Sequence, residues 1–380
     1  MATTMSMDGL RELAGFRAQN GCAISLYLDL DPSVVPTAAD VATRVRSLLD
    51  AGAKSHGATR GDLAREVREG LKADFERLQR YFEEDFDRDG ARGLAVFAAG
   101  PDNVWSALPL TGSVPDTIRV ADDFLLAPLV PLVGRGDAGL VAVVNREAGR
   151  LYALRGGRLE EIADRSEDAP GRHDQGGWSQ ARFQRHIDNL VHEHYKAVAE
   201  ELEERYRKLQ RPRIVVVCPE EVRPELTDAL STELEDAIIG WAQAEQHAGP
   251  TELQEVVVPF FDRWHEERVA ACLERWREES GRLGRATSGW EATLEAAADA
   301  RVELLLYTRG VSRDAFRCPA CGRVSANART CPLDGTTMEA RDDGLDLAVR
   351  QTLAHGGEVL PLHERPDLDH VEGIAALLRY

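Results

Sequence analysis

The segment Arg172–His186, RHDQGGWSQARFQRH, organises the interpretation of this chain because it passes from a loop into a long helix. The run Asp164–Gly177 is rich in Asp, Ser, Pro and Gly and has almost no apolar side chain to bury, which is typical of a loop. Ser179 can cap the helix that follows, and the helical pattern continues to about Lys208. The sequence therefore predicts a Gly-Gly tip at one end of a long helix.

The predicted helix has an apolar face and a basic face. At about 100° per residue, one stripe collects Phe183, Ile187, Leu190, His194, Val198 and Leu202. The opposite face carries Arg182, Arg185, Asn189, His192 and Lys196. We expect His194 to be a core histidine with a buried hydrogen bond. A basic face beside a loop suits insertion into a phosphate-lined RNA cavity, although a surface loop before an ordinary amphipathic helix also explains the pattern.

The pattern Gly176-Gly177-x-Ser179-x-x-Arg182-Phe183-x-Arg185 resembles the Gly-Gly-Gln loop of the archaeo-eukaryotic class I peptide-chain release factors. In that family Gly-Gly-Gln is followed by Ser, then by Arg-Phe and a further Arg at these same spacings. The departure is Trp178, which stands where the family has Gln. The pattern is therefore most similar to the bacterial branch of the superfamily, in which the tripeptide varies.

The resemblance implies an α/β protein with three domains. These are an N-terminal α/β domain over residues 1–135, a ribonuclease-H-like middle domain over 136–262 and a C-terminal domain over 263–380. The C-terminal domain is expected to have the fold of kink-turn-binding ribosomal proteins, with a zinc ribbon inserted at 316–337. The sequence has no Asn-Ile-Lys-Ser motif, so we do not expect the N-terminal domain to read stop codons.

Hydrophobic periodicity and turn signals independently predict alternating helices and strands. Before a Gly-Arg-Gly-Asp boundary at 134–137 we expect strands at 22–30, 93–99 and 104–110 and helices at 37–54 and 62–82. The middle domain is predicted to have strands at 140–144, 150–154, 158–162 and 213–218, a hairpin turn at Gly156-Gly157 and a helix at 220–234. Its acidic residues lie mostly on exposed helix faces or in the loop, so we discount metal-dependent nuclease chemistry.

For the C-terminal domain we expect helices at 259–282 and 345–355, a helix from Trp290, and strands at 302–307, 358–362 and 374–380. On the first of these helices, Trp264, Leu273 and Trp276 are the expected buried contacts. Core packing is a more natural role for these tryptophans than base stacking.

Two Cys-Pro-x-x-Gly turns, Cys318-Pro-Ala-Cys321-Gly and Cys331-Pro-Leu-Asp334-Gly, predict a metal site. Each tight turn presents two ligands, and its Gly lets the backbone curl toward the metal. Asp334 occupies the fourth position, where structural zinc sites prefer thiolate or imidazole, so His355 or His363 can replace it if the fold brings one close. The alternatives are a zinc ribbon held mainly by its three thiolates and a relic ribbon that folds without metal. In either case we expect a structural role.

Composition restricts the partners and the compartment. The chain has 380 residues and a formal net charge of −19, so it is not a general nucleic-acid-coating protein, and RNA contacts have to be local. It has no apolar run long enough for a membrane span and no signal-peptide pattern. Its six cysteines are three clustered and three scattered, which is not a disulfide framework. We therefore expect a cytoplasmic protein.

The resemblance further implies a translation factor that docks in the ribosomal A site like a tRNA. In the family the backbone amide of Gln helps to position the water that hydrolyses the peptidyl-tRNA ester. By position, the catalytic loop residues are Gly176, Gly177, Trp178, Ser179 and Gln180. The expected RNA contacts are Arg172, His173, Arg182, Arg185, His186 and Lys196.

Two functions stay open because Trp178 keeps the backbone amide but adds bulk at the water site. The first is a ribosome-binding factor for stalled or idle ribosomes that has weak or no hydrolytic activity. The second is an active peptidyl-tRNA hydrolase that releases nascent chains during ribosome rescue, with Gln175 or Gln180 taking part beside the loop. A translational GTPase is a further candidate partner.

Overall fold

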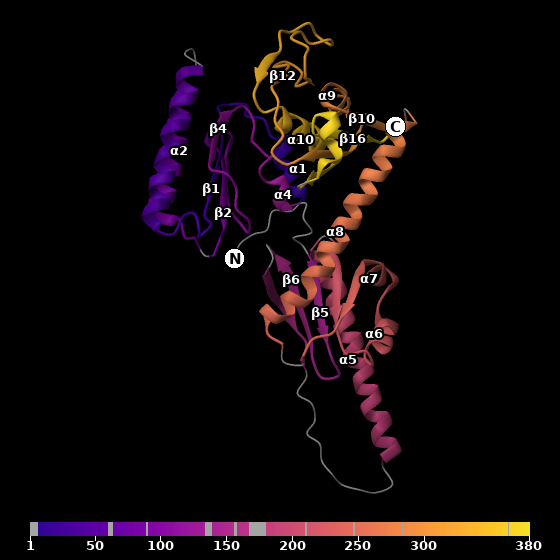
Figure 1. The fold of residues 1–380 in the computed structure, drawn as a ribbon. Helices are drawn as coiled ribbons and strands as arrows, with labels where there is room; N and C mark the ends of the chain where they lie inside the picture. Colours follow the sequence, from indigo (N-terminus) through magenta and orange to yellow (C-terminus); the bar gives the residue numbers. More distant parts are fainter. Residues whose placement is uncertain are drawn as a thin grey trace. The chain divides into compact units, whose positions relative to one another are not determined.

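The protein has a mixed α/β fold (Figure 1). The computed structural model describes residues 7–59, 64–88, 90–133, 139–155, 158–166, 180–209, 211–245, 248–282, 284–363 and 365–380. Contacts divide the chain into two compact units: a first unit of Met1–Gly134 with Val269–Tyr380, and a middle unit of Arg135–Arg268. The division into three domains stays a prediction. None of the described helices has the length and apolar character that crossing a bilayer requires.

The first unit contains an antiparallel sheet with the strand order β3-β2-β1-β4. Its strands are β1, Ala23–Asp29; β2, Gly93–Ala99; β3, Val104–Leu110; and β4, Thr117–Ala121, with a 3-10 turn at Gly100–Asp102. The three predicted strands are present to within two residues. Strand β4 was not predicted: Ile118 and Val120 alternate with polar residues, but this pattern spans only five residues at the edge of the sheet.

The two faces of this sheet pack against different parts of the chain. Ile24, Leu26 and Leu28 of β1 face α2, Ala38–Thr59, and α3, Arg65–Arg80, which ends in a π-helical turn at Tyr81–Asp85. The alternate residues Ala23 and Tyr27 face the opposite way, into a core that includes C-terminal residues. Successive side chains of a strand point to opposite faces, so one short strand joins both cores.

A second sheet of the first unit has the strand order β10-β16-β11-β15, in which only β11 and β15 are parallel. Its strands are β10, Ala286–Ser288; β11, Val302–Thr308; β15, Glu358–Leu362; and β16, Ile374–Leu378. The remaining elements are α9, Trp290–Ala298; α10, Gly344–Ala354; and a 3-10 segment, Pro366–Val371. Val269, Leu273 and Trp276, from the end of α8, pack on the other face of this sheet from α9 and α10. The burial predicted for Leu273 and Trp276 is confirmed.

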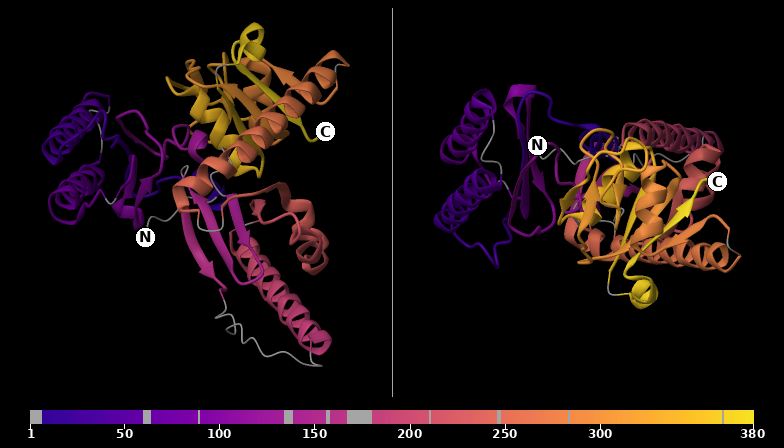
Figure 2. Two further views of the ribbon diagram at one scale, coloured as in Figure 1. Left: turned by 60° about the horizontal axis from the view of Figure 1, so that its bottom comes forward. Right: turned by 90° about the horizontal axis from the view of Figure 1, so that it is seen from above.

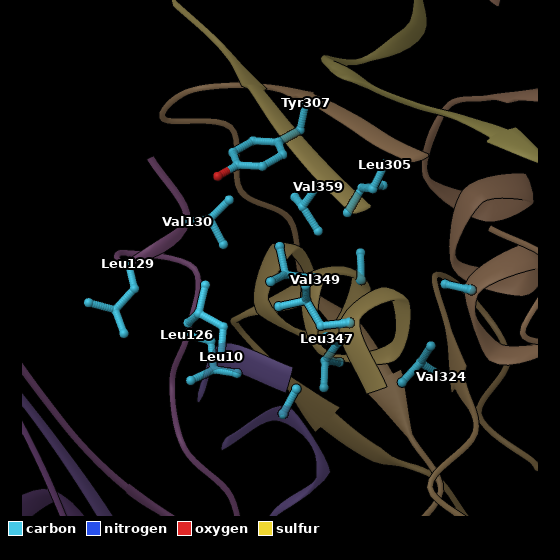
Figure 3. Close-up of a cluster of buried hydrophobic side chains, with 14 of the residues drawn as sticks. Leu10, Leu126, Leu129, Val130, Leu305, Tyr307, Val324, Leu347, Val349 and Val359 are labelled. Atoms are coloured by element: carbon cyan, nitrogen blue, oxygen red, sulfur yellow. The ribbon is translucent and has the colours of Figure 1, made fainter. Parts of the chain in front are cut away.

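One apolar core joins the N-terminal and C-terminal segments of the first unit (Figure 3). It contains Leu10 of α1, Met7–Gly15, and Leu126 just before α4, Val130–Val133. Both lie in the same cluster as Val349 of α10, and all three are at most 1% exposed. Each fully buried side chain of this kind contributes roughly 1.5–3 kcal/mol. The two ends of the chain therefore stabilise each other.

The middle unit contains one five-stranded sheet with the order β7-β6-β5-β8-β9. Its strands are β5, Gly139–Val144; β6, Gly149–Arg155; β7, Arg158–Asp164; β8, Arg213–Val217; and β9, Ile238–Ala242. Strands β7, β6 and β5 are antiparallel neighbours, whereas β5, β8 and β9 run parallel. The four predicted strands of this unit are confirmed, while the turn at Gly156-Gly157 lies outside the described residues.

Helices cover both faces of this sheet. One face is covered by α5, Gln180–Lys208; α6, Arg223–Ala229; and α7, Thr232–Ala237. The other is covered by Leu253, Val257 and Phe261 from the first part of α8, Pro250–Gly281. Figures 1 and 2 show α5 continuing past the edge of the sheet.

Three expectations for this region are wrong in detail. The single helix expected at 220–234 is two helices, because the backbone of Leu230 is extended, with ψ of 150°, and α7 starts again after Ser231. Helix α8 begins at Pro250 instead of Pro259, which lies inside it. Trp264 is only half-buried, with the Arg213 guanidinium 5.0 Å from its ring centroid.

Candidate functional site

Helix α5, which follows the predicted loop, packs on the sheet with only part of its length. Tyr195, Val198 and Leu202 are at most 1% exposed and lie in the core of the middle unit. Leu190 is 39% exposed, so its predicted burial is wrong. The reason is that Val191, half-buried, is the first residue with a described side chain to reach the sheet. The N-terminal turns of α5 therefore lie beyond the core.

His194 fixes the rotation of this helix. It is 3% exposed, and its Nε2 lies 3.2 Å from the backbone oxygen of Asn145, which follows β5. The predicted core histidine with a buried hydrogen bond is confirmed. Because His194 faces the sheet, the opposite residues Asn189, His192 and Lys196 are exposed, as predicted.

Glu201, on the sheet-bound part of α5, pairs with one arginine of the same helix and with one that follows β7. Glu201 is 5% exposed and accepts a hydrogen bond from Nε of Arg205 at 2.7 Å and from Nε of Arg165 at 2.9 Å. These hydrogen bonds from Arg165, followed by those from Arg205, hold the pKa of Glu201 below its usual value. Arg165 directly follows β7, so the last strand before the predicted loop is tied to the middle of the helix that follows that loop.

This anchor explains how the helix carries the loop away from the sheet. Between Gln180, where α5 begins, and Glu201 the helix rises by about 32 Å at 1.5 Å per residue. The chain leaves the sheet beside Glu201 and begins α5 at the far end of that rise. Among the residues with described side chains, burial in α5 starts only at Val191. The two described side chains that precede Val191 on α5, Asn189 and Leu190, are both exposed.

The residues of the predicted loop site have different outcomes. Arg172, His173, Gly176, Gly177, Trp178 and Ser179 lie outside the described residues. Gln180, Arg182, Arg185 and His186 lie on the first turns of α5, whose backbone is helical as expected. Lys196 is exposed and has Glu193 at 3.9 Å, so its charge is partly balanced by a neighbour on the same helix. The catalytic and RNA-contacting roles stay predictions.

The predicted metal ligands come together in the ribbon of the first unit. The ribbon is a small sheet of β12, Ala315–Arg317; β13, Val324–Ser325; and β14, Glu339–Arg341. Ligand atoms of Cys318, Cys321, Cys331 and Asp334 all lie within 4.8 Å of one another. The Cys321 and Cys331 sulfurs are 3.6 Å apart, and the Cys318 sulfur is 3.5 Å from Asp334 Oδ2. This spacing suits a single ion bound by all four side chains.

The two turns that carry the ligands have the same backbone geometry. The amide of Gly322 donates to the carbonyl of Cys318 at 2.9 Å, and the amide of Gly335 donates to the carbonyl of Cys331 at 3.0 Å. Both glycines have positive φ, 77° and 73°, which other residues rarely adopt. The predicted role of Gly in curling each turn is confirmed, and the second turn keeps this form although Asp334 replaces a cysteine.

Asp334 is held in the orientation that a ligand requires. The amide of Thr336 donates to its Oδ1 at 2.9 Å, and hydrogen bonds from Thr336 hold the pKa of Asp334 well below its usual range. The carboxylate is therefore ionised, as a metal ligand has to be. Neither His355 nor His363 belongs to the cluster of ligands. Asp334 is thus the fourth ligand that the geometry offers.

A buried charge cluster beside the ribbon was not predicted from the sequence. Asp123 has no exposed surface and has four arginines around it, Arg317, Arg119, Arg341 and Arg350, at distances of 2.5, 2.6, 3.5 and 3.6 Å. Burial raises the pKa of Asp123, but the four positive charges outweigh burial and hold it below its ordinary value. Arg350 also donates to the carbonyl oxygens of Ala14 and Phe16, both at 3.1 Å. No local signal reveals this cluster, because Asp123 and Arg317 are 194 positions apart.

Comparisons with known proteins find similarity to release factors. A family model described as bacterial archaeo-eukaryotic release factor family 10 matches residues 125–259. Peptide chain release factor subunit 1 of Archaeoglobus fulgidus is 24% identical, with 98% of this chain and 96% of that protein covered. The Methanobrevibacter smithii protein of the same name is 26% identical over 53% of this chain, which spans about half of that protein, 51%. A solved structure, a model of ribosome-bound archaeal Pelota and ABCE1, is 14% identical with a TM-score of 0.41, covering 100% and 95% of the two chains.

The family match covers the strands β5–β9 and the helix α5 that would carry the Gly-Gly loop, and the Archaeoglobus alignment extends over nearly the whole chain. The middle unit is therefore similar to bacterial archaeo-eukaryotic release factor family 10, and the chain as a whole resembles archaeal peptide chain release factor subunit 1.

Proposed function

We propose that this protein is a ribosome-binding translation factor that docks in the A site of stalled or idle ribosomes, with weak or no hydrolysis of peptidyl-tRNA. The observation that carries the proposal is the way α5 is mounted. Its second half is fixed by His194 and by the pairing of Glu201 with Arg165, while its first turns, with Arg182 and Arg185, extend beyond the sheet. A rigid projecting helix can bring Gly176-Gly177-Trp178 into a site that the body of the protein cannot enter.

The strand order supports the proposed ribonuclease-H-like fold of the middle domain. Three antiparallel strands are followed by two that lie parallel to the first and on its other side. We also propose the kink-turn-binding ribosomal-protein fold for the C-terminal domain, in which α9 and α10 cover a mixed four-stranded sheet. A translational GTPase as a partner stays a prediction.

The residue at position 178 determines how much hydrolysis we expect. The family Gln contributes its backbone amide to position the attacking water, and Trp178 retains that amide. The indole is far larger than the Gln side chain, so we expect it to displace the water. Correct positioning of reactants can be worth several kcal/mol of activation free energy, which is enough to make a reaction undetectable when it is lost.

Peptide release from purified ribosomes that hold peptidyl-tRNA tests this part of the proposal. The wild-type protein should bind and release no peptide, whereas Trp178→Gln should gain measurable release. Trp178→Leu is the matched control, because it removes the indole without restoring Gln and should stay inactive. Robust release by the wild type that is lost in Gly177→Ala would establish the alternative, an active hydrolase for ribosome rescue.

We further propose that the ribbon binds one zinc ion through Cys318, Cys321, Cys331 and Asp334. Three thiolates and a carboxylate within 4.8 Å of one another suit zinc better than calcium or magnesium, because these hard cations prefer oxygen ligands. Zinc would cross-link the two turns and would have no catalytic role. Elemental analysis of the purified protein should find close to one zinc per chain, and a metal-free protein with an unchanged melting curve would favour the relic ribbon.

A further inference from the structure

We propose that metal binding by the ribbon and the packing of the N-terminal segment against it are thermodynamically linked through Arg17. This inference rests on the proposed zinc site and not on ribosome binding. Through this linkage, metal binding stabilises the contact between the N-terminal and C-terminal segments of the chain. Three contacts of the first unit carry it.

The first contact reaches directly into the metal-binding turn. Arg17 follows α1 and donates from Nη2 to the carbonyl oxygen of Pro319 at 2.8 Å. Pro319 lies between the ligands Cys318 and Cys321. The direction of its carbonyl is therefore set by the conformation that the turn adopts around the metal. A segment from the beginning of the chain thus touches the backbone of the metal site itself.

The second contact ties the same turn to the same arginine from the other side. Arg317 directly precedes Cys318, and its Nη1 lies 3.0 Å from Oδ1 of Asp122. Nε of Arg17 lies 3.1 Å from Oδ2 of Asp122. One carboxylate is therefore shared between an arginine of the N-terminal segment and an arginine adjacent to a ligand. A shift of the turn has to disturb both contacts.

The third contact supplies a local reporter. The amide of Ala18 donates to the backbone oxygen of Asp122 at 2.8 Å, which makes its hydrogen exchange sensitive to the position of Asp122. Without the metal, the two turns lose the ion that would bind all four ligands, and we expect Pro319 to move more easily away from Arg17. Ala18 should then lose protection, whereas Val96 in the middle of β2 should keep it.

Linkage is reciprocal. If the metal strengthens the contacts of Arg17 by some factor in equilibrium constant, then these contacts have to increase metal affinity by the same factor. The test measures zinc affinity of the full-length protein by competition with a chelator. Arg17→Ala should raise the dissociation constant about fivefold, at the lower end of common coupling strengths. The protein should remain folded in this design, because the Arg17 side chain is 35% exposed and its partner Asp122 keeps the ion pair with Arg317.

Arg44→Ala is the matched control. Arg44 is 34% exposed and pairs at 2.8 Å with Asp116, which is 26% exposed; Arg17 pairs with Asp122, which is 25% exposed. The two variants lose similar ion pairs, but of the two arginines only Arg17 has a described contact with the ribbon. Zinc affinity should be unchanged in Arg44→Ala, so general destabilisation of the N-terminal segment is excluded as the cause.

Each outcome of these measurements either supports or contradicts the linkage. Weaker zinc binding in Arg17→Ala alone, with faster exchange at Ala18 on zinc removal, supports the linkage. Equal affinities of the wild type and Arg17→Ala, or equal losses in both variants, overturn it. A wild-type protein that binds no zinc overturns the metal site and the linkage together. None of these results depends on ribosome co-sedimentation, which tests the proposed function separately.

Discussion

The ribbon and the loop-bearing helix are each fastened by a carboxylate that bridges arginines, but the two clusters differ in their exposure to water. The four arginines around Asp123, next to the ribbon, are only 9–15% exposed. Around Glu201, on α5, Arg165 is 55% and Arg205 is 32% exposed. The Asp123 cluster is largely buried, whereas the arginines of the Glu201 cluster are partly exposed to water.

The difference shows what each region is built to do. Desolvated charges have to be matched closely, so the Asp123 cluster holds the N-terminal and C-terminal segments in one arrangement. The Glu201 cluster holds only the sheet-bound half of α5, and the helix beyond Val191 is left without core contacts among the described side chains. The ribbon is thus a fixed part of its unit, whereas the docking role of the first turns of α5 stays a proposal.

Removing Asp123 should have the largest effect on stability. In Asp123→Ala four largely buried arginines lose the carboxylate that balances them, and breaking a buried ion pair in this way costs about 3–5 kcal/mol. Denaturant unfolding, monitored by hydrogen exchange of the β16 amides, should show this decrease in the stability of the first unit. Glu69→Ala, which removes a pair on the surface of α3, should cost at most about 0.5 kcal/mol. Similar losses of stability in both variants would contradict the conclusion that the Asp123 cluster is buried and closely matched.

Removing a thiolate should have the next largest effect. If the roughly 10–16 kcal/mol of a structural zinc site is shared by four ligands, Cys318→Ser should weaken zinc binding by about two orders of magnitude. Asp334→Ala should weaken it less than tenfold, because a carboxylate adds less to a thiolate-dominated site. Chelator competition measures both constants, and a larger loss in Asp334→Ala would contradict this ranking.

The smallest effect is expected at Glu201. Glu201→Gln should destabilise the middle unit by about 1 kcal/mol at pH 7, because Arg165 and Arg205 remain partly hydrated without their partner. The folded-state pKa of Glu201 is lowered, so its stabilisation is present above the unfolded pKa of about 4.3 and is lost as the pH falls through the folded pKa. Denaturant melts at several pH values should therefore converge for wild type and variant as the pH falls below the folded-state pKa of Glu201, on the acid side of about 4.3. A difference that persisted there would rule out the ion pair as its source.

Sequence patterns predicted elements whose information is local. The period of α5 placed its buried and exposed faces, and the spacing within each Cys-Pro-x-x-Gly turn placed two ligands and a positive-φ glycine. The error at Leu190 arose because periodicity gives the apolar face of a helix but not the point at which the sheet beneath it ends.

Features formed by distant residues could not be predicted in this way. Strands β4 and β9 are short edge strands: the alternation in β4 covers only five residues, and β9 has none. The contacts of Asp122 and Asp123 with Arg317 join positions 195 and 194 residues apart, and a pair of aspartates in a loop has no pattern that identifies its partners. Only the fold brings these charges together.

Co-sedimentation with ribosomes tests whether α5 docks on the ribosome. The wild-type protein should pellet with ribosomes, and its binding should weaken as salt rises, because phosphate contacts release counterions. The double variant Arg182→Glu/Arg185→Glu should stay in the supernatant. The control Arg207→Glu/Lys208→Glu makes the same change of charge at the sheet-bound end of α5 and should still pellet. Unchanged binding by Arg182→Glu/Arg185→Glu, or equal loss in both double variants, would contradict the proposal that the projecting end of α5 docks on the ribosome.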